Sequence, residues 1–378
     1  MNERVATRII FFIAGMVTAI WAVIVPFAKV NTGVDEAVLG SLLLCLGAGA
    51  IVAMPLTGPL TSRFGCRKVI GCAVMIVILA TPFLSVISDP LALGLTLLIF
   101  GIGIGITDCA MNIQAIIVEK TSGKPLMSGF HGMYSVGGIA GAGLMTALLT
   151  LGLTVMLSVA TLSILVLGLL VISYRTLLPY ANPPEGPAFA IPRGTVLVLG
   201  VICFVVFLAE GTVLDWSALY LVENRGVAES SGGLGFAVFA AAMTLGRLSG
   251  DYIISRLGSL TVVLVGALVA IAGFMVVIIS SGLPALLAGY LLVGIGCANI
   301  VPVMFSQTGK QNSMPQMVAV PAVTTLGYIG VLAGPAMIGY IAHHSSLPHA
   351  FIFVMLLMLL AALLSLSLRK VFARSVVS

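Results

Sequence analysis

The sequence predicts an all-α membrane protein with about twelve transmembrane helices in two bundles of six. Hydrophobic residues make up 60% of the 378 residues, charged residues make up only 8%, and the mean hydropathy is +1.23. A soluble domain would carry about 25% charged residues. The apolar residues also form continuous runs of about 20, the length that spans a bilayer as a helix, and not the alternating pattern of a β-barrel. The charges lie in short islands between these runs.

Polar breaks divide the chain into twelve apolar runs, and each run is predicted to be one spanning helix. The first run ends without a small-residue cleavage site, which favours a retained helix over a signal peptide. The predicted helices are 8–29, 38–60, 69–87, 92–117, 128–150, 153–173, 195–222, 232–254, 260–280, 285–307, 316–342 and 350–368.

The longest polar break lies in the middle of the chain and includes Asn182, Pro183, Pro184, Glu185 and Pro187. Such a composition is typical of a linker between two folded parts. The sequence therefore predicts an N-terminal six-helix bundle over 1–173 and a cytoplasmic linker over 174–194. A C-terminal six-helix bundle with a short cytoplasmic tail is predicted over 195–378.

The basic residues indicate the orientation. If both termini are cytoplasmic, only Lys29 and Arg225 fall outside, whereas the remaining loop lysines and arginines fall inside. An excess of Lys and Arg in cytoplasmic loops is the usual pattern of membrane proteins. The net charge of +5 is thus explained by these loops, and it gives no reason to expect a nucleic acid partner.

The second half of the sequence repeats features of the first at a constant offset of 193 residues. A single register across three separate regions predicts a parallel repeat, with a solute site between the two halves. The offset pairs Ser62, Arg63 and Gly65 with Ser255, Arg256 and Gly258; Gly101 and Gly103 with Gly294 and Gly296; Gln114 with Gln307; and Gly137, Ala140 and Gly141 with Gly330, Ala333 and Gly334.

After the second predicted helix the chain reads Gly58-Pro-Leu-Thr-Ser62-Arg63-Phe-Gly65-Cys-Arg67-Lys68. This segment resembles the loop signature Gly-x-x-x-Asp-Arg-x-Gly-x-Arg/Lys-Arg/Lys of the major facilitator superfamily, and the resemblance covers nearly the whole chain. It implies the major facilitator fold. Arg63 is assigned to gating at this loop, although Ser62 stands where the family has Asp, which argues against a strong charge relay.

A narrower resemblance rests on three segments. They are Asp108-Cys-Ala-Met-Asn112, His131-Gly-Met-Tyr134-Ser-Val-Gly-Gly and Glu210-Gly-Thr-Val-Leu-Asp215-Trp216. Together they are similar to the branch around the fucose/proton symporters and its uncharacterised bacterial inner-membrane relatives. The resemblance implies transport coupled to an ion gradient in the bacterial inner membrane, with the acidic residue of the fourth helix, here Asp108, as proton carrier.

Three carboxyl groups fall well inside the predicted spans, namely Asp108, Glu210 and Asp215. Ionisable groups are costly in lipid and usually mark a transport pathway. Asp108 and Glu210 are therefore predicted to bind substrate or a proton, and the alternative for each is a fixed structural partner. Asn112 lies four residues after Asp108 on the same helix face and joins this site. Asp215 lies nearer the outer surface and is predicted to gate it.

Aromatic residues could complete the predicted site. Trp21 and Trp216 occupy nearly equivalent places in the first and seventh helices and could flank a sugar ring, or they could belong to the interfacial aromatic belt. Tyr134 shares one face of the fifth helix with His131. His131 lies close to the start of its helix, near the predicted inner mouth, where a cap or packing role is favoured.

Arg247 and Asp251 lie four residues apart in the eighth predicted helix. This spacing lets opposite charges neutralise each other on one helix face. We expect a local ion pair that steadies the inner gate.

The predicted function is secondary transport of a small polar solute, such as a sugar, by alternating access with proton coupling. The partners expected are the solute, protons and the lipid bilayer, and the chain is expected to act as a monomer. Proton-driven efflux of amphipathic compounds is one alternative, since Gly330-Val-Leu-Ala-Gly334-Pro335 resembles a signature of drug/proton antiporters, and a non-transporting receptor is another. No enzyme, cofactor or metal is expected, because no nucleotide-binding loop, nucleophile-base pair or paired cysteine spacing is present.

Overall fold

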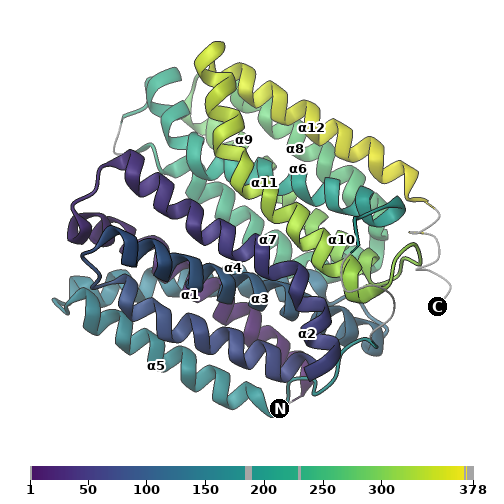
Figure 1. Cartoon of the computed structure of the whole chain (residues 1–378). Helices are drawn as coiled ribbons and strands as arrows, with labels where there is room; N and C mark the ends of the chain where they lie inside the picture. Colours follow the sequence, from purple (N-terminus) through teal and green to yellow (C-terminus); the bar gives the residue numbers. More distant parts are fainter. Residues whose placement is uncertain (1, 184–189, 229–230, 370–371, 373–378) are drawn as a thin grey trace. The chain divides into compact units, whose positions relative to one another are not determined.

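The computed structural model describes residues 2–183, 190–228, 231–369 and 372. Every regular element in these ranges is a helix (Figure 1). Residues 184–189 of the predicted linker, and 370–371 and 373–378 of the predicted tail, lie outside the described residues. The chain forms two compact units. Unit 1 is Met1–Ser122, Met133–Ala190 and Pro315–Pro321, and unit 2 is Gly123–Gly132, Ile191–Met314 and Ala322–Ser378.

Unit 1 is built from α1 (Glu3–Thr32), α2 (Glu36–Leu84), α3 (Pro90–Ser122), α5 (Val155–Tyr174) and the larger part of α4 (Met127–Thr150). α2 lies along α3, and α1 contacts both α3 and α5 (Figure 1). Small residues bring α1 and α4 together, because a Cβ at Gly137 or Gly141 would collide with backbone atoms of Phe12 or Met16. Close approach at glycines is how helices pack in membranes.

Side-chain caps fix where several helices of unit 1 begin. The Asn2 side chain accepts the Val5 N–H at 3.0 Å at the start of α1, and Thr154 accepts the Leu157 N–H at 3.2 Å at the start of α5. Such caps satisfy backbone donors that have no partner within the helix. α1 ends at Gly33, whose φ of 63° is a left-handed conformation suited to glycine.

The predicted loop over 61–68 is shortened to a turn at one residue, because the helices on both sides of it extend further than predicted. α2 runs through it with one non-helical residue, Gly65, at φ 80° and ψ 157°. In unit 2, Gly258 adopts the same conformation, φ 79° and ψ 153°, between α7 (Leu234–Leu257) and α8 (Ser259–Ile279). Only glycine reaches this region without strain, so a single residue can turn the chain.

Unit 2 contains α6 (Gly194–Leu219), which continues into the π-helical turn η1 (Tyr220–Asn224), and then α7 and α8. They are followed by α9 (Leu283–Cys297), α10 (Ile300–Thr308), most of α11 (Gln316–His344) and α12 (Leu347–Ser367). α8 packs against α9 and α12, and α7 packs against α9 (Figure 1).

The prediction of one continuous helix over 285–307 is wrong, because the helix is interrupted. α9 ends at Cys297, and α10 begins at Ile300 after a break at Ala298 and Asn299. Pro302 explains the break, since it lacks the N–H that would bond to the Ala298 carbonyl and its ring crowds that carbonyl. The Ala298 carbonyl is therefore left without a partner from its own helix.

Ten helices in the described part of the chain are long and apolar enough to cross a membrane. α2 counts once among them although it extends over 49 residues on both sides of Gly65. α7 is 24 residues long but is not among the ten, because Arg247 and Asp251 lower its hydropathy. These two helices account for the difference between the observed ten and the predicted twelve.

Candidate functional site

A charged pair lies within unit 2, between α6 and α7. Nη2 of Arg247 is 3.1 Å from Oε1 and 3.4 Å from Oε2 of Glu210. The side chains are 7% and 17% exposed, respectively, so both are largely removed from solvent. A charge buried in this way is tolerable only when it is paired. The partner of Glu210 is a basic side chain from another helix, whereas the structural alternative considered for it was a neighbouring backbone group or hydroxyl.

Arg247 also contacts the break between α9 and α10. Its Nε donates a hydrogen bond to the Ala298 carbonyl at 3.3 Å. In return, Nδ2 of Asn299 donates to the Gly246 carbonyl at 3.0 Å. Gly250 leaves room for this arrangement, because a Cβ there would collide with Oδ1 of Asn299. One turn of α7 is therefore bonded to the break by two reciprocal hydrogen bonds.

The beginning of α4 lies against the same turn of α7. The Gly129 N–H donates to Oδ2 of Asp251 at 3.0 Å. The imidazole of His131 packs on Phe305 of α10, with ring centroids 5.6 Å apart, and lies within electrostatic range of Arg247. The prediction paired Arg247 locally with Asp251, whereas the structure pairs Arg247 with Glu210, a residue of another helix. The gating roles of His131, Arg247 and Asp251 stay predictions.

Asp108 lies in the middle of α3 in unit 1. Its side chain is partly exposed, and none of the described residues gives its carboxyl group a hydrogen bond or an ion pair. Asn112 is fully buried, and its Nδ2 donates to the Asp108 main-chain carbonyl at 2.9 Å. Its Oδ1 has no hydrogen-bond partner among the described residues. The predicted shared face thus holds a carboxyl group and a buried amide oxygen, and neither has a hydrogen-bond partner among the described residues.

The predicted aromatic residues of unit 1 pack on neighbouring helices. Trp21 is 6% exposed and its ring centroid lies 6.3 Å from that of Phe100 in α3. The Tyr134 hydroxyl is 3.5 Å from Oγ1 of Thr18, a long hydrogen bond between α4 and α1. Neither contact tests a role in substrate binding, which stays a prediction for both residues.

The other predicted residues are Asp215 and Trp216 of unit 2 and Arg63 of unit 1. Asp215 is exposed, and none of the described residues bonds to its carboxyl group. The Trp216 indole lies beside Gly339 of α11, and its Nε1 is buried without a hydrogen-bond partner among the described residues. Arg63 is exposed and lies 5.2 Å from the centre of the Phe64 ring. The roles predicted for Asp215, Trp216 and Arg63 stay predictions.

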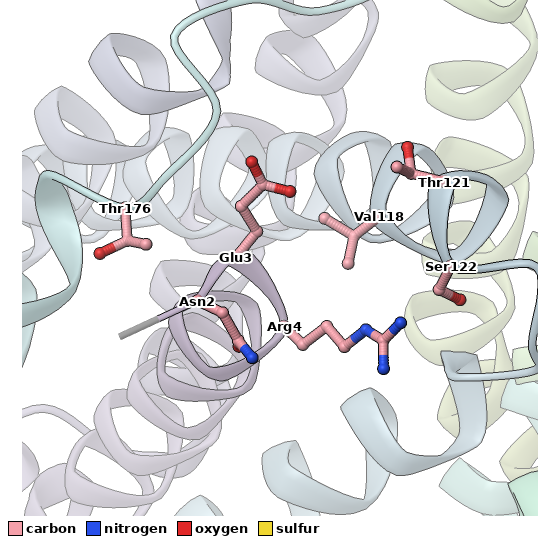
Figure 2. A pocket seen from close by; sticks show the side chains of 7 residues that line it. All are labelled: Asn2, Glu3, Arg4, Val118, Thr121, Ser122 and Thr176. Carbon is pink, nitrogen blue, oxygen red and sulfur yellow. The ribbon is translucent and has the colours of Figure 1, made fainter.

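A pocket of about 440 Å³ lies at one end of unit 1 and contains none of the predicted site residues (Figure 2). It is formed by the start of α1, the end of α3 and Thr176. The side chains of Arg4, Thr121 and Ser122 border it, together with those of Asn2, Glu3 and Val118. Within the described residues, no group of three or more His, Cys, Asp or Glu could hold a metal ion.

The sequence identified Glu210 and Arg247 as candidate site residues, but it did not predict the ion pair between them. Glu210 and Arg247 are 37 residues apart in different helices, and no local spacing links them. Asn299 was not singled out, although Pro302 gave a usable signal. A proline inside an apolar run implies an unpaired carbonyl four residues earlier, and a donor must come from elsewhere.

Membrane-length apolar helices that hold ionisable side chains in their interiors define a multi-pass integral membrane transport protein. The chain belongs to the Major Facilitator Superfamily, whose family model matches residues 8–313. This confirms the superfamily to which the sequence was assigned.

Individual comparisons agree with the assignment. An uncharacterised MFS-type transporter of Yersinia pestis is 49% identical over 363 residues, covering 96% of this chain and 94% of the relative. An uncharacterised transporter of Sinorhizobium fredii is 32% identical over 95% of this chain and 96% of its own length. The crystal structure of the E. coli fucose:proton symporter has a TM-score of 0.79 at 14% identity, covering 96% of this chain and 97% of the symporter. This likeness shows a shared fold.

Proposed function

We propose that the protein is a proton-coupled secondary transporter of a small polar solute, such as a sugar or a related metabolite, in the bacterial inner membrane. Asp108 is the proton carrier in this proposal, and Asn112, Glu210, Trp21, Tyr134 and Trp216 contribute to solute binding. The transport cycle is alternating access, the mechanism expected of two-bundle transporters.

The observation that carries the proposal is the difference between Asp108 and Glu210, the two carboxyl groups predicted to bind substrate or a proton. Glu210 is neutralised by Arg247 at 3.1 Å. No described side chain neutralises Asp108. Burying a charged carboxyl group in a membrane costs free energy, and without a basic partner the group lowers this cost by binding a proton or a polar ligand. Asp108 is thus free to exchange a proton during the cycle, while Glu210 keeps its counter-charge.

The proposal includes twelve spans in a parallel repeat with both termini in the cytoplasm. Counting α2 as two helices about Gly65 and adding α7 to the ten gives twelve. Equivalent contacts support the repeat, since a Cβ at Gly101 would collide with the Leu46 carbonyl and a Cβ at Gly294 with the Phe239 carbonyl. Both the glycines and their partners differ by the offset of 193 residues found in the sequence.

The experiment begins with a thermal-shift screen of the purified protein against sugars and related polyols, because a ligand of the native state raises its stability. Solutes that bind are then added to proteoliposomes that contain a pH-sensitive dye. We expect solute to drive proton uptake by the wild type. The Asp108→Asn variant should bind the solute but lose proton uptake at least tenfold.

Glu223→Gln is the matched control, because it removes an exposed carboxyl group that lies outside the proposed site, in η1, and should leave proton uptake within about twofold of the wild type. Glu210→Gln should weaken solute binding while the remaining uptake stays coupled to protons. If Asp108→Asn takes up protons with solute as the wild type does, Asp108 is not the carrier and the proposal is wrong in its coupling.

A further inference from the structure

The α9–α10 break contains a backbone carbonyl whose partner comes from outside the helix. In a continuous helix the Ala298 carbonyl would accept the N–H of residue 302, but residue 302 is a proline and has none. A buried carbonyl without a donor costs free energy comparable to a lost hydrogen bond. Nε of Arg247 supplies the missing donor at 3.3 Å.

The same guanidinium contacts Glu210 through Nη2 at 3.1 Å. Because the guanidinium group is planar and rigid, fixing its Nε on one acceptor fixes the direction in which its Nη atoms point. The position of the Ala298 carbonyl therefore determines where Arg247 meets the Glu210 carboxylate. Asn299 holds the break against α7 from the other side through the Gly246 carbonyl.

The corresponding region of unit 1 has no equivalent of Pro302, Arg247 or Asn299. At the offset of 193 residues, Cys109 stands for Pro302, Met54 for Arg247 and Ile106 for Asn299. α3 accordingly runs unbroken from Pro90 to Ser122. The proline, the arginine and the asparagine occur together in one half and are absent together from the other, as expected if they act as a unit.

We propose that Arg247 is a positioning residue for Glu210, and that it is itself oriented by the carbonyl that Pro302 leaves free. The bend between α9 and α10 and the ionic state of Glu210 are thereby coupled. If the bend straightens, the Ala298 carbonyl moves away from Arg247, and Arg247 loses the hydrogen bond that orients it toward the Glu210 carboxylate. This inference rests on the proposed function only in treating Glu210 as part of the solute site.

The test uses the purified full-length protein and needs no substrate. Pro302→Ala restores an N–H at position 302, which can bond to the Ala298 carbonyl and compete with Arg247. Dicyclohexylcarbodiimide, which modifies protonated carboxyl groups in apolar surroundings, then serves as the probe of Glu210. Its attachment to the α6 peptide is measured by mass spectrometry across a pH series.

We expect Pro302→Ala to raise the labelling of Glu210 at least threefold, although neither Glu210 nor Arg247 has been changed. Among the described residues, other titratable groups near the pair are the thiols of Cys203 and Cys297, the imidazole of His131, and the carboxyl group of Asp251, one turn after Arg247 in α7. All four are retained in the variant, so the change reports on Arg247. Unchanged labelling at every pH would overturn the proposal.

A double-mutant cycle gives the second measurement. Arg247→Lys keeps the charge but loses the planar geometry, and it should lower the thermal unfolding midpoint in the wild-type background. In the Pro302→Ala background the same substitution should lower it by less than half as much, since the carbonyl no longer needs the arginine. Equal decreases in both backgrounds would contradict the proposal.

Arg256→Lys is the matched control, because Arg256 lies on the same helix, is exposed and stacks on Tyr252 at 5.4 Å. Arg256→Lys should leave the labelling of Glu210 unchanged. Its effect on the thermal unfolding midpoint should be the same with and without Pro302→Ala. Proton uptake by Asp108 variants is measured separately, so failure of the coupling mechanism and failure of this inference are distinguishable.

Discussion

Two buried glutamines, related by the sequence offset, have different surroundings. Nε2 of Gln114 donates to Oγ1 of Thr7 at 3.0 Å, and its Oε1 accepts the Leu178 N–H at 3.1 Å. The amide of Gln307 is equally buried, yet neither its oxygen nor its nitrogen has a hydrogen-bond partner among the described residues. The repeat in the sequence predicts the positions of the two amides but not their bonds.

This difference predicts opposite effects of one substitution. Gln114→Leu should destabilise the protein by about 1–3 kcal/mol, because it leaves the Leu178 N–H buried without an acceptor. Gln307→Leu should be neutral or stabilising, because it removes a buried amide that makes no described bond. Thermal unfolding of the two variants in the same detergent checks the prediction. A larger loss for Gln307→Leu than for Gln114→Leu would contradict it.

The candidate site also shows that the sequence can identify buried ionisable residues but not their interaction partners. The cost of charge in lipid was sufficient to select Asp108 and Glu210 from the sequence. It could not decide which of them had a basic partner, since Arg247 comes from another helix and reaches Glu210 only after folding. Asn112 was correctly placed near Asp108, but its amide bonds to the helix backbone, which spacing alone does not reveal.

At the scale of elements, the segment after α5 is bound to the turn about Gly65. The Arg67 side chain donates to the Leu177 carbonyl at 2.9 Å and to the Arg175 carbonyl at 2.6 Å. The Arg67 N–H donates to the Leu178 carbonyl at 2.7 Å, and Oγ of Ser62 donates to the Asn182 carbonyl at 2.8 Å. The beginning of the predicted linker is therefore part of the unit 1 structure.

Loss of Arg67 should release this segment. Arg67→Ala should increase amide hydrogen exchange across 175–182 at least tenfold, because both side-chain bonds to the segment are removed and local opening becomes easier. Exchange followed by mass spectrometry measures the effect. Arg63→Ala is the control, since Arg63 lies in the same turn and contacts the Phe64 ring. Equal protection of the segment in Arg67→Ala and the wild type would refute the prediction.

At the scale of the whole molecule, the asymmetry of the basic residues predicts the orientation in the membrane. Lys and Arg in short loops favour the cytoplasmic side, and this assigns Asn182 to the cytoplasm and Arg225 to the outer side. Reporters inserted after these two residues check the assignment. Alkaline phosphatase should be active only after Arg225, and a fluorescent protein only after Asn182. The reverse pattern would show that the orientation is wrong.

Several glycines related by the sequence offset have similar surroundings within their own units. Gly65 and Gly258 share one backbone conformation, and the equivalent glycines of α3 and α9 approach equivalent carbonyls. These similarities follow from the sequence, because a glycine is required wherever the backbone takes a positive φ or two helices nearly touch. The break in α9–α10 has no counterpart in α3 because only α9–α10 has a proline in its interior, Pro302, whereas the proline of α3, Pro90, is its first residue.

The sequence by itself determined that the chain crosses a membrane as apolar helices and belongs to the Major Facilitator Superfamily, and which ionisable residues lie within the spans. Hydropathy and local motifs are properties of consecutive residues, so they can be read without a fold. Only the tertiary structure decided that Arg247 neutralises Glu210, that Arg247 supplies the donor missing at Ala298, and that no described partner occupies the Asp108 carboxyl. Hydrogen bonds and ion pairs depend on distances between residues far apart in the chain, and folding alone sets those distances.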